Sequence, residues 1–155
     1  MKKIGMYTAR GIVSETETEA GNPQKIPLFD GLFTTAYRVV GFRIWASSYA
    51  GSSSPDCVGK LSKNELGTTS AANFMRADDD NQIAWAASAG SADGGLGFAD
   101  APVIDRDNLI VEDLYVYVRT TGTAGDAINY IVEMEKYEIT DWQGALTMAR
   151  DKAQG

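Results

Sequence analysis

The chain has 155 residues, 44% of them hydrophobic, which is enough to fold around a core as one globular domain. Its net charge of −7 argues against nucleic acid and anionic membrane surfaces as partners, because both attract basic proteins. There is no histidine and one cysteine, Cys57, which excludes the usual general base, a thiolate zinc site and an internal disulfide.

The N-terminal region predicts one strand followed by polar chain. The opening Met-Lys-Lys is not followed by an apolar core, so we expect no signal peptide. Residues 4–13 predict a first strand. The stretch SETETEAGNPQK (14–25) alternates glutamate with threonine, which is typical of an exposed edge or an extended arm. Residues 26–29 predict a short second strand.

The clearest early strand is YRVVGFRIWA, residues 37–46. Strict alternation places Arg38, Val40, Phe42 and Ile44 on one face, and Tyr37, Val39, Arg43 and Trp45 on the other. Because both faces carry bulky side chains, we expect this strand to be central and covered on both sides, or to lie at an interface.

The middle of the chain alternates loops with short apolar runs. Residues 59–75 fit either the end of a strand or one helical turn. Residues 82–87 predict a strand with Ile83, Trp85 and Ala87 on one face. The Gly- and Ala-rich stretch 88–102 predicts a long loop, a kind of segment that is often functional in compact domains.

The C-terminal third predicts the best hairpin, formed by residues 109–120 and 128–139 around the turn TGTAGDA. Thr140 and Gln143 then have the spacing of a helix capping box. A helix here would put Trp142, Ala145, Leu146 and Ala149 on one face. A last strand through ALTMA is the competing interpretation, and the two stay open.

Together these elements predict an all-β, single-domain antiparallel fold, either a β-sandwich or a jelly roll. Residues 1–29 form its N-terminal strand and extended arm, residues 30–155 form the sandwich, and a short C-terminal helix is possible.

The densest acidic run is Asp78-Asp79-Asp80-Asn81-Gln82. Asp78, Asp80 and Gln82 have the spacing of the first ligands of a calcium-binding loop. The sixth position is Ile83 instead of the required glycine, so we favour an exposed turn and predict no metal and no cofactor.

Three other candidate sites are also better explained as structural features than as reactive sites. An acidic group surrounds Arg106 and comprises Asp105, Asp107, Glu112 and Asp113. A catalytic carboxylate pair needs a cleft and a raised pKa, which spacing does not provide, so we favour a solvated strand entry. Cys57 has no histidine partner to activate it. The glycine-rich GSADGGLG lacks the Gly-Lys-Ser/Thr ending of a phosphate loop.

The aromatic side chains favour a core or a subunit interface over a sugar-binding platform. The set comprises Tyr37, Trp45, Trp85, Tyr115, Tyr117, Tyr130, Tyr137 and Trp142. We expect interfaces at residues 1–29, at the 88–102 loop and after Trp142. The candidate interface residues are Tyr7, Ile12, Phe29, Trp45, Leu96, Phe98, Trp142, Leu146 and Met148.

Four patches occur in an order that resembles a group of small virion structural proteins of tailed, mostly marine, phages. They are AYRVVGFRIW (36–45), DDNQIAWA (79–86), NLIVEDLYVYVR (108–119) and NYIVEMEKYEITDWQGALTMARDKAQG (129–155). The first 29 residues carry little of this resemblance, and none of the patches is a catalytic signature.

The resemblance implies a non-enzymatic capsid decoration or cement protein at the capsid surface, made in the host cytoplasm. Its partners would be copies of itself, as a trimer, and the major capsid protein, with many symmetric copies adding up weak contacts. The alternatives are a neck, tail or fibre-attachment component, and a carbohydrate-binding β-sandwich module. An enzyme would require a carboxylate pair that shares a cleft.

Overall fold

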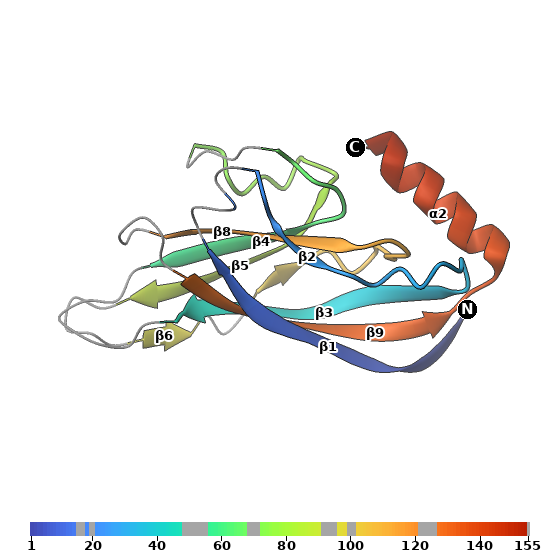
Figure 1. Ribbon diagram of the computed structural model, residues 1–155, viewed down its shortest axis with the longest axis horizontal. Helices are drawn as coiled ribbons and strands as arrows, with labels where there is room; N and C mark the ends of the chain where they lie inside the picture. The colour runs from blue at the N-terminus through green and yellow to red at the C-terminus, as the bar shows by residue number, and fades with distance from the viewer. Residues whose placement is uncertain are drawn as a thin grey trace.

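The computed structural model describes residues 1–14, 18, 21–47, 56–67, 72–90, 96–98, 102–120 and 127–154. Two antiparallel β-sheets pack face to face, and helix α2 (Asp141–Gln154) stands at one end of the sandwich (Figure 1). This confirms the predicted all-β sandwich. It also resolves the C-terminal ambiguity in favour of the helix.

The first sheet, called sheet A here, contains three long strands in the order β1 (Lys2–Ser14), β9 (Ala127–Glu138) and β3 (Thr35–Ala46). The second, sheet B, has the order β2-β8-β4-β5-β6, with β7 pairing β5. Its strands are β2 (Gln24–Ile26), β8 (Leu114–Thr120), β4 (Cys57–Ser62), β5 (Gln82–Gly90), β6 (Leu96–Phe98) and β7 (Val103–Ile104).

The first predicted strand is confirmed and is longer than expected, because β1 pairs with β9 from Lys2 to Ser14. The second short strand lies earlier than predicted and ends at Ile26. Pro27 follows directly and has no N–H to donate to a ladder, which explains that end. Residues 15–17, 19 and 20 of the predicted acidic arm lie outside the described part of the chain.

The predicted hairpin between residues 109–120 and 128–139 is wrong. β8 pairs with β2 and β4 in sheet B, whereas β9 pairs with β1 and β3 in sheet A. The two strands are consecutive in sequence but lie in opposite sheets, so their apolar faces meet across the core. Residues 109–113 also lie before the strand, and Ile110 forms an isolated bridge with Tyr37.

The predicted faces of β3 are partly wrong because of a β-bulge. Val39 pairs with Met134 and Gly41 with Glu133, so Val40 is an extra residue without a partner position. Val39 therefore faces the core before the bulge, and Phe42 and Ile44 face it after the bulge. The strand is also not central, because β9 occupies the middle of sheet A.

A second bulge changes the face assignment in β5. Leu61 pairs with Ala84 but Ser62 pairs with Gln82, so Ile83 is the extra residue. Ile83 is consequently buried together with Ala84 and Ala86, whereas Ala87 is exposed. The ambiguous segment from residue 59 begins as a strand and stays in β4 to Ser62.

The predicted loop 88–102 contains more strand than expected. β5 continues to Gly90, and the backbone of Leu96–Phe98 forms β6 against it. Residues 91–95 and 99–101, which include most of the glycine-rich stretch, lie outside the described part of the chain.

The core lies between the two sheets and is filled from both. Its fully buried members include Phe42 and Met134 of sheet A, and Leu61, Leu114 and Val116 of sheet B. A separate small cluster of Ala36, Val111, Tyr137 and Ile139 receives Met148 from helix α2.

Candidate functional site

Helix α2 begins with the predicted capping box. The Thr140 N–H donates to Gln143 Oε1 at 3.2 Å, and the Gln143 N–H donates to Thr140 Oγ1 at 3.3 Å. This reciprocal pair satisfies two N–H groups that a helix start would otherwise leave open, and it sets where the helix leaves β9.

Five apolar side chains of α2 point away from the domain, whereas Met148 packs against it. Trp142 is 74% exposed and Leu146 57% exposed, and Ala145, Ala149 and Ala153 on the same face are also exposed. We call these five residues the outer stripe. At 3.6 residues per turn, the buried positions Gly144 and Asp151 lie on the opposite side of the helix.

The inner face of α2 makes close but small contacts. Gly144 is packed so tightly on Phe33 that an added Cβ would overlap the Phe33 carbonyl oxygen and Cβ. One turn later, Met148 packs against the small cluster that contains Val111 and Tyr137. The glycine therefore allows the backbone of α2 to approach the 28–34 segment closely.

A buried ion pair fixes the last turn of α2. Lys63 Nζ lies 3.1 Å from Asp151 Oδ1, and the two side chains are 2% and 9% exposed. Lys63 also donates to Asn108 Oδ1 at 3.3 Å, and Asn64 Nδ2 donates to the Asp151 carbonyl at 3.1 Å. The residues after β4 thus hold the helix through charge and hydrogen bonds.

The outer face of sheet A forms a second surface. In register, Ile131 of β9 lies between Arg10 of β1 and Arg43 of β3. The next row places Asn129 between Ile12 and Trp45. Arg10, Ile12 and Arg43 are exposed, and Ile131 and Trp45 are half-buried.

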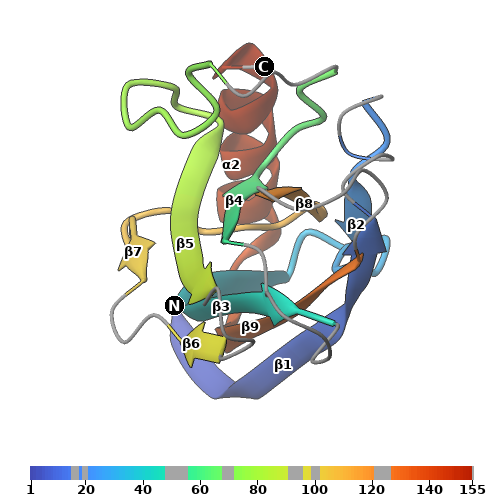
Figure 2. The same cartoon turned by 90° about the vertical axis from the view of Figure 1, so that its left-hand side faces the viewer.

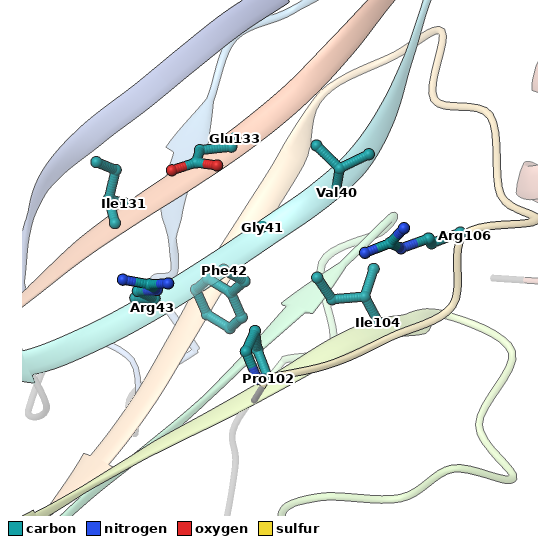
Figure 3. Close-up of a pocket in the computed structure, with 9 residues that line it drawn as sticks. All are labelled: Val40, Gly41, Phe42, Arg43, Pro102, Ile104, Arg106, Ile131 and Glu133. Atoms are coloured by element: carbon teal, nitrogen blue, oxygen red, sulfur yellow. The ribbon is translucent and has the colours of Figure 1, made fainter. Parts of the chain in front are cut away.

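A cleft of about 370 Å³ extends from this face around the edge of β3 (Figure 3). Arg43 and Glu133 line it on the sheet side, and Pro102, Ile104 and Arg106 line it on the β7 side. The bulge at Val40 and the missing side chain of Gly41 leave room there. A Cβ at Gly41 would lie 3.0 Å from Glu133 Oε2.

The outer face of sheet B is covered by its own chain. Lys60 lies between Tyr117 and Trp85 in register and is 3% exposed. Its Nζ donates to the Phe74 carbonyl at 2.7 Å and lies 4.2 Å from the centre of the Phe74 ring. Burial lowers the pKa of Lys60 to about 8.

The acidic run 78–82 forms a turn that leads into β5. Arg76 forms a two-pronged ion pair with Asp78, at 2.9 and 2.6 Å. The Gln82 side-chain oxygen accepts from the Arg76 N–H and from Trp85 Nε1. Two of the three candidate calcium ligands, Asp78 and Gln82, are therefore engaged elsewhere. In the described part of the chain, no three acidic or cysteine side chains gather as a metal site.

The second acidic group is also structural. Asp113 accepts from the Leu28 and Phe29 N–H groups and pairs with Lys25 at 3.1 Å. Burial alone would raise the pKa of Asp113, but these three donors together hold it below its usual value. Asp105 accepts from the Asp107 N–H and from Asn108, as in a local turn.

The remaining candidates lie mostly in the core. Cys57 begins β4 and is buried. Tyr37, Tyr117, Tyr130 and Tyr137 are buried as well. Trp85 lies beside Asp79, Asp80 and Asp105 in a hollow of about 190 Å³, but no second aromatic side chain lines that hollow among the described residues.

The predicted interface residues divide into three groups. Tyr7, Ile12, Phe29, Trp142 and Leu146 are exposed. Trp45 is half-buried, and Met148 is half-buried against the small cluster under α2. The side chains of Leu96 and Phe98 lie outside the described part of the structure.

Sequence reasoning missed Arg10, Lys60 and the Lys63–Asp151 pair, and it named Arg43 and Arg106 without assigning them to a site. Lys60 and Lys63 look like solvent-facing residues in a strand because polar residues normally face water. The pair of Lys63 with Asp151 joins residues 88 positions apart, which no local pattern reveals. The arginines could have been noticed as cations at outward positions of an otherwise acidic chain.

No protein-family model and no curated protein sequence matches this chain. Within the described residues, no helix has the length and apolar character needed to cross a membrane.

Proposed function

We propose that this protein is a non-enzymatic virion structural protein, a capsid decoration or cement protein that stiffens the shell of a tailed phage. Two lines support the proposal. One is the resemblance of the four sequence patches to small phage virion proteins. The other is the main structural support for the proposal, and it is the outer stripe of α2.

A helix at the surface of a monomer normally turns its apolar side toward the core. Here Trp142 and Leu146 project from the helix on the side opposite to Gly144 and Asp151. Tryptophan is among the residues that contribute most to protein interfaces. The stripe therefore suits contact with another protein, either a further copy of this chain in the predicted trimer or the major capsid protein.

The test is light scattering of the purified protein together with co-sedimentation on isolated capsids. We expect an oligomer that pellets with capsids. Trp142→Ser/Leu146→Ser is expected to weaken assembly. The matched control Met75→Ser/Val103→Ser also removes two exposed apolar side chains, which are 40% and 64% exposed, but leaves α2 intact.

A monomer that ignores capsids would contradict the proposal. Binding to isolated tails or necks in place of capsids would favour the neck, tail or fibre-attachment alternative. If neither occurs, a glycan-binding screen addresses the carbohydrate-binding alternative, with Trp85 and its acidic neighbours as the place to examine.

A further inference from the structure

We propose that the outer face of sheet A is a docking surface for carboxylate side chains of a partner protein, with Arg10, Arg43 and Arg106 as the binding groups. In the setting of the proposed function, that partner surface belongs to the capsid shell. The outer face of sheet A is then the side of the molecule that meets the shell, and its arginines bind carboxylates of the shell protein.

The first observation is the concentration of guanidinium groups in an acidic chain. Arg10 and Arg43 flank Ile131 in one cross-strand row, and Arg43 and Arg106 line the same cleft (Figure 3). The chain carries 21 acidic and 14 basic residues, so two arginines beside one isoleucine and a third across the cleft stand out against its overall charge. Each guanidinium presents a planar fork of donors that matches a carboxylate.

The second observation concerns the partners of these three arginines. None of the three forms an ion pair with a carboxylate in the described part of the chain, whereas Arg76 and Lys3 do with Asp78 and Glu135. Glu133 also lines the cleft, and no ion pair joins it to Arg43 or Arg106 among the described residues. Three exposed cations remain available for an outside carboxylate.

The third observation is that no described element covers the middle of this face, around Ile131. The outer face of sheet B is covered by Phe74 and its neighbours, which enclose Lys60. Figures 1 and 2 show no described element over the middle of the outer face of sheet A, whereas at its end near α2 the outward-facing Ala36 and Tyr137 pack against Val111 and Met148. Its apolar members Ile12, Trp45 and Ile131 also line a hollow next to Arg10.

The mixture of side chains favours a protein over a phosphate polymer. Tryptophan and arginine are the residues most enriched in the central contacts of protein interfaces, and Ile12 and Ile131 add apolar area between them. A phosphate backbone would use the guanidinium groups alone, whereas a protein surface can also cover the apolar side chains between them.

The test compares the wild-type chain with Arg10→Gln/Arg43→Gln/Arg106→Gln. The control, Lys2→Gln/Arg76→Gln/Lys152→Gln, makes the same change in net charge at exposed cations outside this face. The probes are immobilised poly-L-glutamate, single-stranded DNA of similar charge, and isolated capsids, each at low and at raised salt. Thermal unfolding confirms that both triple variants are folded.

We expect wild type and control to bind poly-L-glutamate. The arginine variant should bind it at least about tenfold more weakly, because removing arginines from the centre of an interface usually costs that much affinity. Arg10→Lys/Arg43→Lys/Arg106→Lys keeps the charge but loses the fork, and is expected to lie between them.

Equal binding by the arginine variant and the control would overturn the inference. Stronger binding to DNA than to poly-L-glutamate would also overturn it, in favour of a phosphate-binding face. If the poly-L-glutamate result holds but the wild-type chain does not pellet with capsids, the docking surface stands and the proposed function fails. The two ideas therefore fail separately.

Discussion

The two faces of helix α2 reverse the usual arrangement of a surface helix. The inner face packs a glycine, a half-buried methionine and a buried aspartate on the sandwich, whereas the outer stripe leaves Trp142 and Leu146 in water. Hydrophobic burial is the dominant force that holds most such helices in place. Here the attachment depends instead on close backbone approach at Gly144 and on the Lys63–Asp151 ion pair.

The difference between the two faces suggests that the inner face of α2 serves stability and that the outer stripe serves assembly. Changes on the inner face are expected to loosen α2 from the domain. Changes on the outer stripe are expected to leave the fold intact and to act on contacts with other molecules.

Asp151→Ala is expected to have the largest effect. It leaves the Lys63 ammonium, 2% exposed, without its carboxylate. Removing one partner of a buried ion pair typically costs about 3–5 kcal/mol. Release of the helix would rehydrate Lys63 and limit the cost. We therefore expect a lower urea midpoint and faster trypsin cleavage at Arg150 and Lys152.

The double variant Lys63→Met/Asp151→Leu is the control for that experiment. It replaces both charges by apolar side chains of similar size, which is often neutral for a buried pair. We expect it to recover most of the stability that Asp151→Ala loses. Wild-type trypsin resistance in Asp151→Ala would show that the ion pair does not hold the helix.

Lys60 provides a buried cation that has no contact with α2 and is surrounded by aromatic rings. Its pKa falls from 10.5 to about 8 in the fold. Between these values the unfolded chain binds more protons than the folded one, so the free energy of unfolding rises with pH. The gain is at most about 3 kcal/mol and is lost as pH falls through about 8.

Urea unfolding of wild type and Lys60→Met between pH 7 and 10.5 measures this dependence. The rise should appear in wild type and be absent in the variant, since other titrating groups are common to both. Identical slopes would mean that Lys60 keeps its ordinary pKa in the fold.

Gly144→Ala is expected to have an intermediate effect. The added Cβ would overlap the Phe33 backbone, and overpacking of this kind costs about 1–3 kcal/mol. Alanine recovers up to about 1 kcal/mol through its higher helix propensity. The net loss should be about 1–2 kcal/mol in urea unfolding, with faster trypsin cleavage of the tail.

The matched control is Gly5→Ala, because a Cβ at Gly5 meets no atom within 4 Å. It should not lower the urea midpoint. If Gly144→Ala also leaves the midpoint and the cleavage rate unchanged, then α2 is not held against the 28–34 segment.

Fold class and most strands were predictable because alternation and turn residues are local signals. The capping box at Thr140 was predictable for the same reason. The side-chain faces of β3 and β5 were not, because a single extra residue at Val40 or Ile83 reverses the alternation. Gly41 beside Val40 is a residue type that often marks a bulge, whereas nothing in the local pattern marks Ile83.

The partners of each strand were harder to predict than the strands themselves. β8 and β9 have good alternation and a turn-rich link, which fits a hairpin and a crossing between sheets equally well. The candidate site also has one part that was predictable from local sequence and one part that depends on strand pairing. Trp142 and Leu146 were predicted as interface residues, whereas the row of Arg10 and Arg43 depends on both strands pairing with β9.

Trp142→Ala should have the smallest effect on stability, because Trp142 lies on the outer stripe of α2 and not on its inner face. The side chain is 74% exposed, so little of its surface is buried on folding. Surface substitutions of this kind usually change the free energy of unfolding by less than about 0.5 kcal/mol. If the outer stripe serves assembly, the same variant should still weaken self-association or capsid binding. A variant that loses stability but not assembly would instead show that Trp142 stabilises α2 itself, and the separation between its two faces would not hold.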